Sequence, residues 1–171
     1  SEMCIRDRLY NPAVALKLPE GETIVPNSIA FDTTPENAMI YVLTGPNRGG
    51  KSVITCAVGL CQVMLQLGMF LPADTCRISP ADGIYTHFPT GADDTIDKGR
   101  LGEECARLGE IFDAVTADSL VLLDESLSST GSFEASYIAA EVLMGLCRVG
   151  CRCLFSTHLH DCLLYTSDAA D

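Results

Sequence analysis

The chain has 171 residues, and 47% of them are hydrophobic, so length and composition exclude a mainly disordered chain and allow one domain with a sizeable core. The formal net charge of −12 argues against this segment alone binding a nucleic-acid backbone, because phosphate contacts need clustered Lys and Arg. Any nucleic acid would then be held by other domains or by a partner.

Membrane, secreted and metal-binding classes find little support in the sequence. No stretch reaches the roughly 18 uncharged apolar residues of a membrane span, and no secretory signal is visible, so we expect a cytoplasmic protein that makes no membrane contact. The nine cysteines have no paired metal-ligand spacing. We expect reduced, buried thiols, with a metal-binding or disulfide role as the alternative.

The two ends of the chain resemble translated sequencing-adapter read-through. They are residues 1–8 and residues 162–171, which we expect to be non-native and leave out of the fold prediction. The native domain would then span residues 9–161 and be truncated from a longer protein at both sides.

Short apolar runs that predict buried strands alternate with longer segments that predict helices. The strands are predicted at residues 40–44, 120–123 and 153–156, with a further candidate marked by Ile78 and Ile84. The helices are predicted at residues 52–67, 103–115 and 134–147, with Gly68 and Gly150 after the first and the last. The first helix is apolar enough to be covered on most sides, and the second has apolar positions at Cys105, Leu108, Ile111, Phe112 and Val115.

This alternation predicts a three-layer α/β fold with a mainly parallel sheet. Ligands in such folds bind beyond the carboxyl ends of the strands. Three of the predicted strands end on residues that carry chemistry, namely Gly45, the pair Asp124 and Glu125, and His158. The predicted sheet therefore brings these residues to one edge.

The segment after the first strand matches the phosphate-binding pattern G-x4-G-K-S. Its glycines allow backbone N–H groups to surround phosphates, Lys51 can reach the β- and γ-phosphates, and the Ser52 hydroxyl can ligate magnesium. The helix that follows directs its positive end toward the anion. We therefore predict a P-loop nucleoside triphosphatase that binds ATP with Mg²⁺. The predicted nucleotide-binding residues here are Gly45, Pro46, Asn47, Arg48, Gly49, Gly50, Lys51, Ser52 and Val53.

Acidic and imidazole side chains supply the remaining predicted functions. Asp124 follows four apolar residues, as the acid that holds magnesium does in P-loop enzymes, and Glu125 is placed to orient or deprotonate the attacking water. His158 can contact the γ-phosphate or that water. We assign catalytic roles to Lys51, Glu125 and His158, and metal binding to Ser52 and Asp124. His87 and His160 are interpreted as structural or surface residues, and no spacing predicts a zinc site.

Together these motifs resemble the ATPase domain of the MutS family of DNA mismatch-repair proteins. The resemblance covers nearly all of residues 10–161. Residues 44–52 resemble the family's TGPNMGGKS loop, with Arg48 where methionine is usual, and residues 119–125 resemble SLVLLDE. The other matching segments are residues 11–12, 25–27, 70–73, 84–86, 91–94 and 156–161.

The resemblance implies an ABC-ATPase-like P-loop domain whose ATP hydrolysis is DNA-dependent in the full-length protein. It places Asn47 near the γ-phosphate and places Ile24 and Val25 against adenine. The family binds ATP in composite sites across a dimer, so a homodimer or MutS-like dimer is expected. Double-stranded DNA would be held by domains absent from this chain, and the nucleotide state would switch the DNA-bound dimer.

Two segments depart from the family's pattern, and both belong to the half of the site that faces the dimer partner. Residues 98–104 stand where the family has GRSTFMVEM, without the Ser-Thr-Phe, and residues 127–135 stand where it has GRGTSTYDG. The alternatives are therefore a MutS-like paralogue that acts on other DNA structures and a nucleotide-binding interaction module with little turnover. An ABC-type transport or regulatory ATPase is a third class, but no intact LSGGQ segment precedes Asp124.

Overall fold

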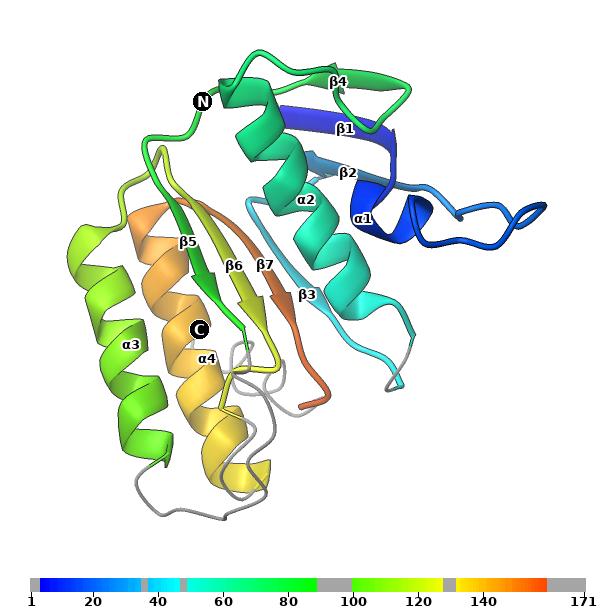
Figure 1. Ribbon diagram of the computed structural model, residues 1–171. Coiled ribbons are helices and arrows are strands. Elements are labelled where there is room, and N and C mark those ends of the chain that lie inside the picture. Colours follow the sequence, from blue (N-terminus) through cyan, green and yellow to red (C-terminus); the bar gives the residue numbers. More distant parts are fainter. Residues whose placement is uncertain (1–3, 35–36, 47–48, 89–99, 128–131, 160–171) are drawn as a thin grey trace.

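A computed structural model of the chain describes residues 4–34, 37–46, 49–88, 100–127 and 132–159 (Figure 1). The strands are β1 (Cys4–Leu9), β2 (Asn27–Phe31), β3 (Ile40–Leu43), β4 (Thr75–Arg77), β5 (Ile84–His87), β6 (Leu120–Asp124) and β7 (Arg152–Ser156). The helices are α1 (Pro12–Ala15), α2 (Lys51–Gln66), α3 (Arg100–Ala114) and α4 (Ser132–Val149).

Four strands form a parallel sheet in the order β3-β7-β6-β5. β6 and β7 are buried along their whole length, as near-continuous apolar runs in a parallel sheet should be. The prediction of an α/β fold with a mainly parallel sheet is confirmed. All four carboxyl ends lie at the same edge, and Leu43, Ser156 and Asp124 stand in one row of the pairing register.

Helices cover both faces of this sheet because side chains alternate along each strand. Val121 and Leu123 of β6 pack on the side of α3 and α4, whereas Leu120 and Leu122 pack on the side of α2. Figure 1 shows α3 and α4 next to each other, with α2 separated from them by the sheet. Two apolar clusters therefore form the core, one on each face.

A second sheet was not anticipated from the sequence. Its strands are antiparallel in the order β2-β1-β4, so β1 is the central strand. Most of β1 comes from residues 1–8, the segment left out of the fold prediction. Arg6 of β1 is fully buried, donates to Gln62 Oε1 of α2 at 2.8 Å, and lies over the ring of Phe31.

α2 is anchored by two glutamines near its C-terminal end. Gln62 Nε2 donates to the carbonyl of Ser79 at 3.1 Å. Gln66 exchanges two hydrogen bonds with Ala81, accepting from its N–H at 3.0 Å and donating to its carbonyl at 3.1 Å. These bonds hold the helix against residues 79–81, the segment that leads into β5.

Some expectations about burial were wrong. α2 is not covered on most sides, because Val53, Leu60, Val63 and Leu67 remain 38–69% exposed. These residues lie on the opposite side of the helix from those that pack on the sheet. In α3, Leu108 and Ile111 are buried as predicted but Cys105 is exposed, and Cys147 of α4 is exposed as well. Within the described residues, no helix has the length and hydrophobicity needed to cross a membrane.

Candidate functional site

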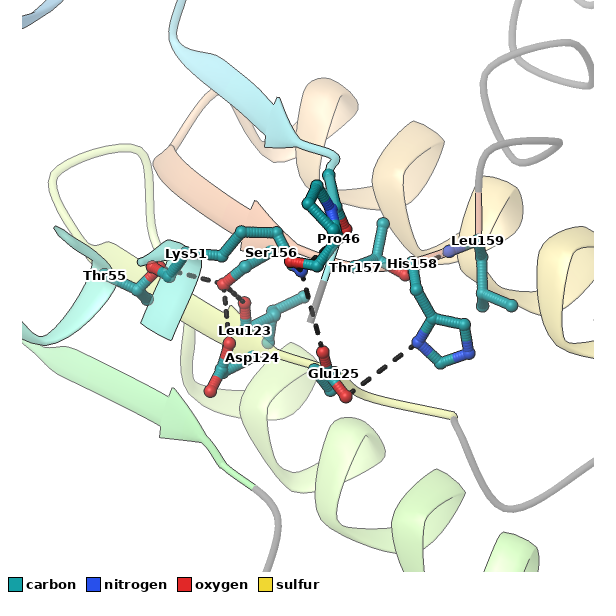
Figure 2. Close-up of polar contacts among 11 residues, drawn as sticks. Pro46, Lys51, Thr55, Leu123, Asp124, Glu125, Ser156, Thr157, His158 and Leu159 are labelled. Carbon is teal, nitrogen blue, oxygen red and sulfur yellow. Dashed lines mark hydrogen bonds and ion pairs between the residues drawn. The ribbon is translucent and has the colours of Figure 1, made fainter. Parts of the chain in front are cut away.

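The carboxyl ends of β3, β7 and β6 are joined by hydrogen bonds between backbones. Thr157 N donates to Leu43 O at 2.9 Å, and Glu125 N donates to Ser156 O at 2.8 Å. The chain therefore leaves all three strands at the same level of the sheet. The loop after β3, the acids after β6 and the histidine after β7 consequently meet at one place, as the sequence predicted (Figure 2).

The loop between β3 and α2 has a conformation that depends on its glycines. Gly50 caps α2 with φ of 84°, in the left-handed region that disfavours side chains. A Cβ at Gly49 would lie 2.9 Å from the carbonyl oxygen of Pro46, whose oxygen accepts a hydrogen bond from Gly49 N at 3.1 Å. The backbone conformation therefore requires glycine at Gly49 and Gly50, two of the glycine positions in the sequence motif.

Lys51 points back into this loop from the first residue of α2. Its Nζ donates to Gly45 O at 2.8 Å and to Pro46 O at 3.0 Å, and the side chain is only 9% exposed. Figure 2 shows the ammonium group between the loop and Glu125. The loop carbonyls therefore fix a positive charge at the N-terminus of α2, a helix of 16 residues. A helix N-terminus also favours a bound anion, so both features favour an anion at this place.

The other residues predicted for the loop have varied surroundings. Ser52 and Val53 are exposed in the first turn of α2, and Asn47 and Arg48 lie outside the described residues. Asn11, which belongs to the Asn-Pro pair of the sequence, is buried and donates from Nδ2 to Val53 O at 3.3 Å. It also caps α1 through its side-chain oxygen. Asn11 thus contacts the first turn of α2.

Asp124 lies at the end of β6 and is 4% exposed. Its Oδ1 accepts a hydrogen bond from the Ser156 hydroxyl at 2.7 Å. Ser156 Oγ lies 2.9 Å from Thr55 Oγ1, and Thr55 Oγ1 lies 2.9 Å from the carbonyl oxygen of Lys51. A line of oxygen atoms therefore runs from α2 to Asp124.

Glu125 lies between Lys51 and His158, the two other residues predicted to be catalytic. Its Oε1 is 3.9 Å from Lys51 Nζ, and its Oε2 is 3.9 Å from His158 Nδ1. Glu125 has φ of 46° and Leu127 has φ of 68°, so the chain after β6 turns through left-handed conformations in non-glycine residues. Such conformations cost energy and cluster at functional sites.

Burial and charge shift the pKa values of two neighbouring groups. Burial, reinforced by the negative charge of Asp124, raises the pKa of the Cys56 thiol on α2, which keeps this thiol protonated. Burial, followed by the positive charge of Arg107, lowers the pKa of His87 at the end of β5. His87 is 2% exposed, so it is a structural residue and not a surface one.

The donor chemistry of this edge fits phosphate and magnesium. Lys51 and the N-terminal turn of α2 supply positive charge, and Ser52 and Asp124 supply the hard oxygen ligands that Mg²⁺ prefers. Magnesium is commonly held by one or two protein oxygens together with phosphate and water. The Ser52 hydroxyl and the Asp124 carboxylate are therefore of the right number and type for a magnesium site.

A family model described as MutS domain V matches residues 41–170, well over half of the chain. The chain belongs to the MutS family. Among curated relatives, this MutS-family chain is 41% identical over 143 residues to the probable DNA mismatch repair protein Msh6 of Drosophila melanogaster. It is 38% identical over 148 residues to DNA mismatch repair protein Msh6 of Homo sapiens, and 36% identical over 156 residues to DNA mismatch repair protein MutS of Salinibacter ruber.

The alignments cover 82%, 82% and 88% of this MutS-family chain, respectively, but only 12%, 11% and 17% of the relatives. The chain therefore spans a small fraction of the length of the proteins it matches. The family match includes most of residues 162–171, which are predicted from the sequence to be non-native.

Two other residues predicted from the sequence, Ile24 and Val25, have no hydrogen bond or ion pair with this cluster among the residues that the structure describes. Ile24 is half-buried and Val25 is 78% exposed in the segment before β2. His160 lies outside the described residues. Of the two divergent segments, the described parts are residues 100–104, in α3, and residues 127 and 132–135, the latter in α4.

Ser156 and Thr55 are not among the functional residues predicted from the sequence. A serine directly before Thr157 and His158, at the polar end of an apolar strand, was the available signal for Ser156. Thr55 lies four residues after Lys51 and so faces the same side of α2, but its partner is 101 residues away in the sequence. Only the tertiary structure joins the two hydroxyls.

Proposed function

We propose that this chain is the ATP-binding and ATP-hydrolysing domain of a MutS-family DNA mismatch-repair protein, with a P-loop fold of the ABC-ATPase-like type. The observation that carries the proposal is the buried Lys51 ammonium group, held by the loop carbonyls 3.9 Å from Glu125. A cation inside a glycine loop, beside a carboxylate that follows a buried strand, is the arrangement that phosphoryl transfer from a nucleotide requires.

In this proposal the nucleotide phosphates bind in the loop at residues 45–52, against the N-terminus of α2. Lys51 would exchange its loop carbonyls for phosphate oxygens, and the backbone N–H groups would supply further donors. Ser52 and Asp124 would hold Mg²⁺, which when bound neutralises phosphate charge. Ile24 and Val25 remain our proposal for the adenine contact.

Glu125 is our candidate for orienting the attacking water and accepting its proton. His158 Nδ1 lies 3.9 Å from the same carboxylate, so the imidazole is placed to contact the attacking water or the γ-phosphate beside Glu125. The side chain of His158 is 45% exposed and that of Glu125 is 28% exposed, which leaves both accessible to a ligand. Water orientation by a positioned carboxylate is the main chemical task left to the protein, because positioning and electrostatics dominate this reaction.

The role of the whole protein is proposed from its relatives. The matched proteins are named as DNA mismatch repair proteins, and their remaining length would supply contacts with double-stranded DNA. An acidic domain with a net charge of −12 is consistent with DNA being bound elsewhere in the protein. We also propose a dimer, in which the divergent residues 98–104 and 127–135 face the partner.

Nucleotide binding by Lys51→Ala is the first test. Removing a charged hydrogen-bonding group costs about 1.5–3 kcal/mol, which corresponds to a loss of roughly 10- to 150-fold in affinity for Mg·ATP. Lys17→Ala, which removes an exposed lysine near α1, is the matched control and should bind as the wild type does. Equal affinity of the wild type and Lys51→Ala in a fluorescent-nucleotide titration would reject the proposed site.

Hydrolysis by Glu125→Gln is the second test, made in the full-length protein. The amide keeps the shape of the side chain but cannot accept the proton of water, so Mg·ATP binding should persist while turnover falls at least about 100-fold. Glu141→Gln changes an exposed glutamate of α4 and serves as the control. Unchanged phosphate release by Glu125→Gln would remove Glu125 from this role. Negligible turnover in the wild type would favour the nucleotide-binding module.

A further inference from the structure

Two fully buried hydroxyl groups, Thr55 and Ser156, lie behind Asp124. Thr55 belongs to the second turn of α2 and Ser156 ends β7, and neither has exposed surface. The distances are 2.9 Å from Thr55 Oγ1 to Ser156 Oγ and 2.7 Å from Ser156 Oγ to Asp124 Oδ1. Figure 2 shows Ser156 between the other two side chains. Both links are of ordinary hydrogen-bond length for oxygen atoms.

The number of protons gives the link to Asp124 a direction. Each hydroxyl donates one hydrogen bond, and an ionised carboxylate only accepts. Ser156 must therefore donate to Asp124. Thr55 has one proton for two acceptors at 2.9 Å, the Lys51 carbonyl and Ser156 Oγ, so its hydroxyl group is shared between them. The contact with Thr55 fixes the place of Ser156 Oγ, and Ser156 in turn holds Asp124 Oδ1.

We propose that Ser156, supported by Thr55, is a positioning residue that fixes the Asp124 carboxylate for magnesium. This inference rests on the proposed function. Ser156 holds Oδ1, and among the described residues no hydrogen bond reaches Oδ2, so Oδ2 is the oxygen left for the metal or for a water bound to it. Groups that hold a metal ligand in this way commonly tune affinity by about 10- to 100-fold.

The same two hydroxyls also connect Asp124 to the loop. Thr55 lies one turn after Lys51 on the same face of α2, and its hydroxyl touches the Lys51 carbonyl. The metal-binding acid and the phosphate-binding lysine are thus joined through two side chains. A shift of α2 along its axis would move Thr55 relative to Ser156, so the orientation of Asp124 depends on the position of the P-loop helix.

The test is the magnesium dependence of nucleotide binding by the chain described above. Ser156→Ala and Thr55→Val remove the hydroxyls, and Thr55→Ser keeps one. We expect all variants to bind a fluorescent ATP analogue equally in EDTA. Mg²⁺ should increase the affinity for the analogue, and we measure the Mg²⁺ concentration that gives half of this increase. That concentration should rise about 10-fold in Ser156→Ala and less in Thr55→Val, and it should return toward the wild-type value in Thr55→Ser.

Ser119→Ala is the matched control, because Ser119 is also buried and also donates to an aspartate, Asp82 Oδ1, at 2.7 Å, but at the opposite edge of the sheet. It should lower thermal stability without changing the Mg²⁺ requirement. The same pattern in Ser156→Ala, or in Thr55→Val should Ser156→Ala not fold, would overturn the inference and leave the nucleotide site standing. A wild-type chain whose nucleotide binding ignores Mg²⁺ would instead reject the proposed function and the inference with it.

Discussion

His87 and Asp124 lie near the same edge of the sheet, and each has a serine hydroxyl as its partner. Ser126 Oγ is 2.7 Å from His87 Nδ1, as Ser156 Oγ is from Asp124 Oδ1. Within the described part of the chain, His87 Nε2 is buried without a hydrogen-bond partner. Burial and the charge of Arg107 lower the pKa of His87, while Glu104 opposes them. The imidazole is therefore neutral at pH 7.

This pKa shift predicts a dependence of stability on pH. Because the folded pKa lies below the ordinary value of 6.5, the unfolded chain binds a proton first as the pH falls. The contribution of His87 is complete above pH 6.5 and is lost as the pH falls from 6.5 through the folded pKa, with a limiting slope of about 1.4 kcal/mol per pH unit. Urea denaturation between pH 7.5 and 5.5 measures it. His87→Gln should flatten the profile. Parallel profiles for His87→Gln and the wild type would contradict the assignment.

At the scale of elements, α2 and β6 are packed closely at a glycine. A Cβ built on Gly59 would lie 2.6 Å from Leu122 Cδ1, and Leu122 is only 1% exposed. The leucine cannot move without disturbing the cluster between α2 and the sheet. Gly59 therefore sets how near α2 lies to β6, the strand that carries Asp124.

Two glycine substitutions separate packing from helix propensity. Gly59→Ala should lower the free energy of unfolding by about 1–3 kcal/mol, because it overpacks a buried contact. Gly109→Ala in α3, where a Cβ meets nothing within 4 Å, should raise it by about 0.5–1 kcal/mol. Guanidinium denaturation of both variants checks the signs. Stabilisation by both would mean that α2 can move away from β6 at little cost.

The parts of the fold that the sequence predicted are those where one local signal is strong. The runs at residues 40–44, 120–123 and 153–156 are apolar and end in functional residues, so the parallel strands and the meeting of their ends could be derived. The antiparallel sheet could not be, because β4 has three residues and β1 lay in a discarded segment. The hydroxyls behind Asp124 were missed because their positions depend on tertiary packing.

At the scale of the whole molecule, the antiparallel sheet depends on the segment expected to be foreign. β2 and β4 both pair with β1 and not with each other. We propose that residues 1–8 and 162–171 are absent from the native gene. Since the pairing needs a central strand, the native residues before Leu9 should also alternate in the manner of a half-buried strand.

Resequencing the gene with long reads tests this proposal. We expect the native reading frame to diverge from this chain before Leu9 and after Asp161. Deleting residues 1–8 without replacement should cost several kcal/mol of stability, because it removes the central strand and the Arg6 contact with Gln62. Recovery of the same terminal residues from genomic DNA would refute the proposal.

The pair of hydrogen bonds between Gln66 and Ala81 has a consequence for which substitutions this helix tolerates. The Gln66 side-chain amide both donates to and accepts from Ala81, which is the reciprocal pair of hydrogen bonds that two antiparallel strands exchange. The side chain therefore bonds to Ala81 as the peptide group of a neighbouring strand would. Neither size nor hydrophobicity can substitute for that polarity. Glutamate has the right shape but only acceptors, and methionine or leucine has the right volume but no N–H donor. Replacements that look conservative in an alignment would therefore remove both bonds to Ala81 and leave Gln62 as the remaining glutamine that holds α2 to the segment entering β5.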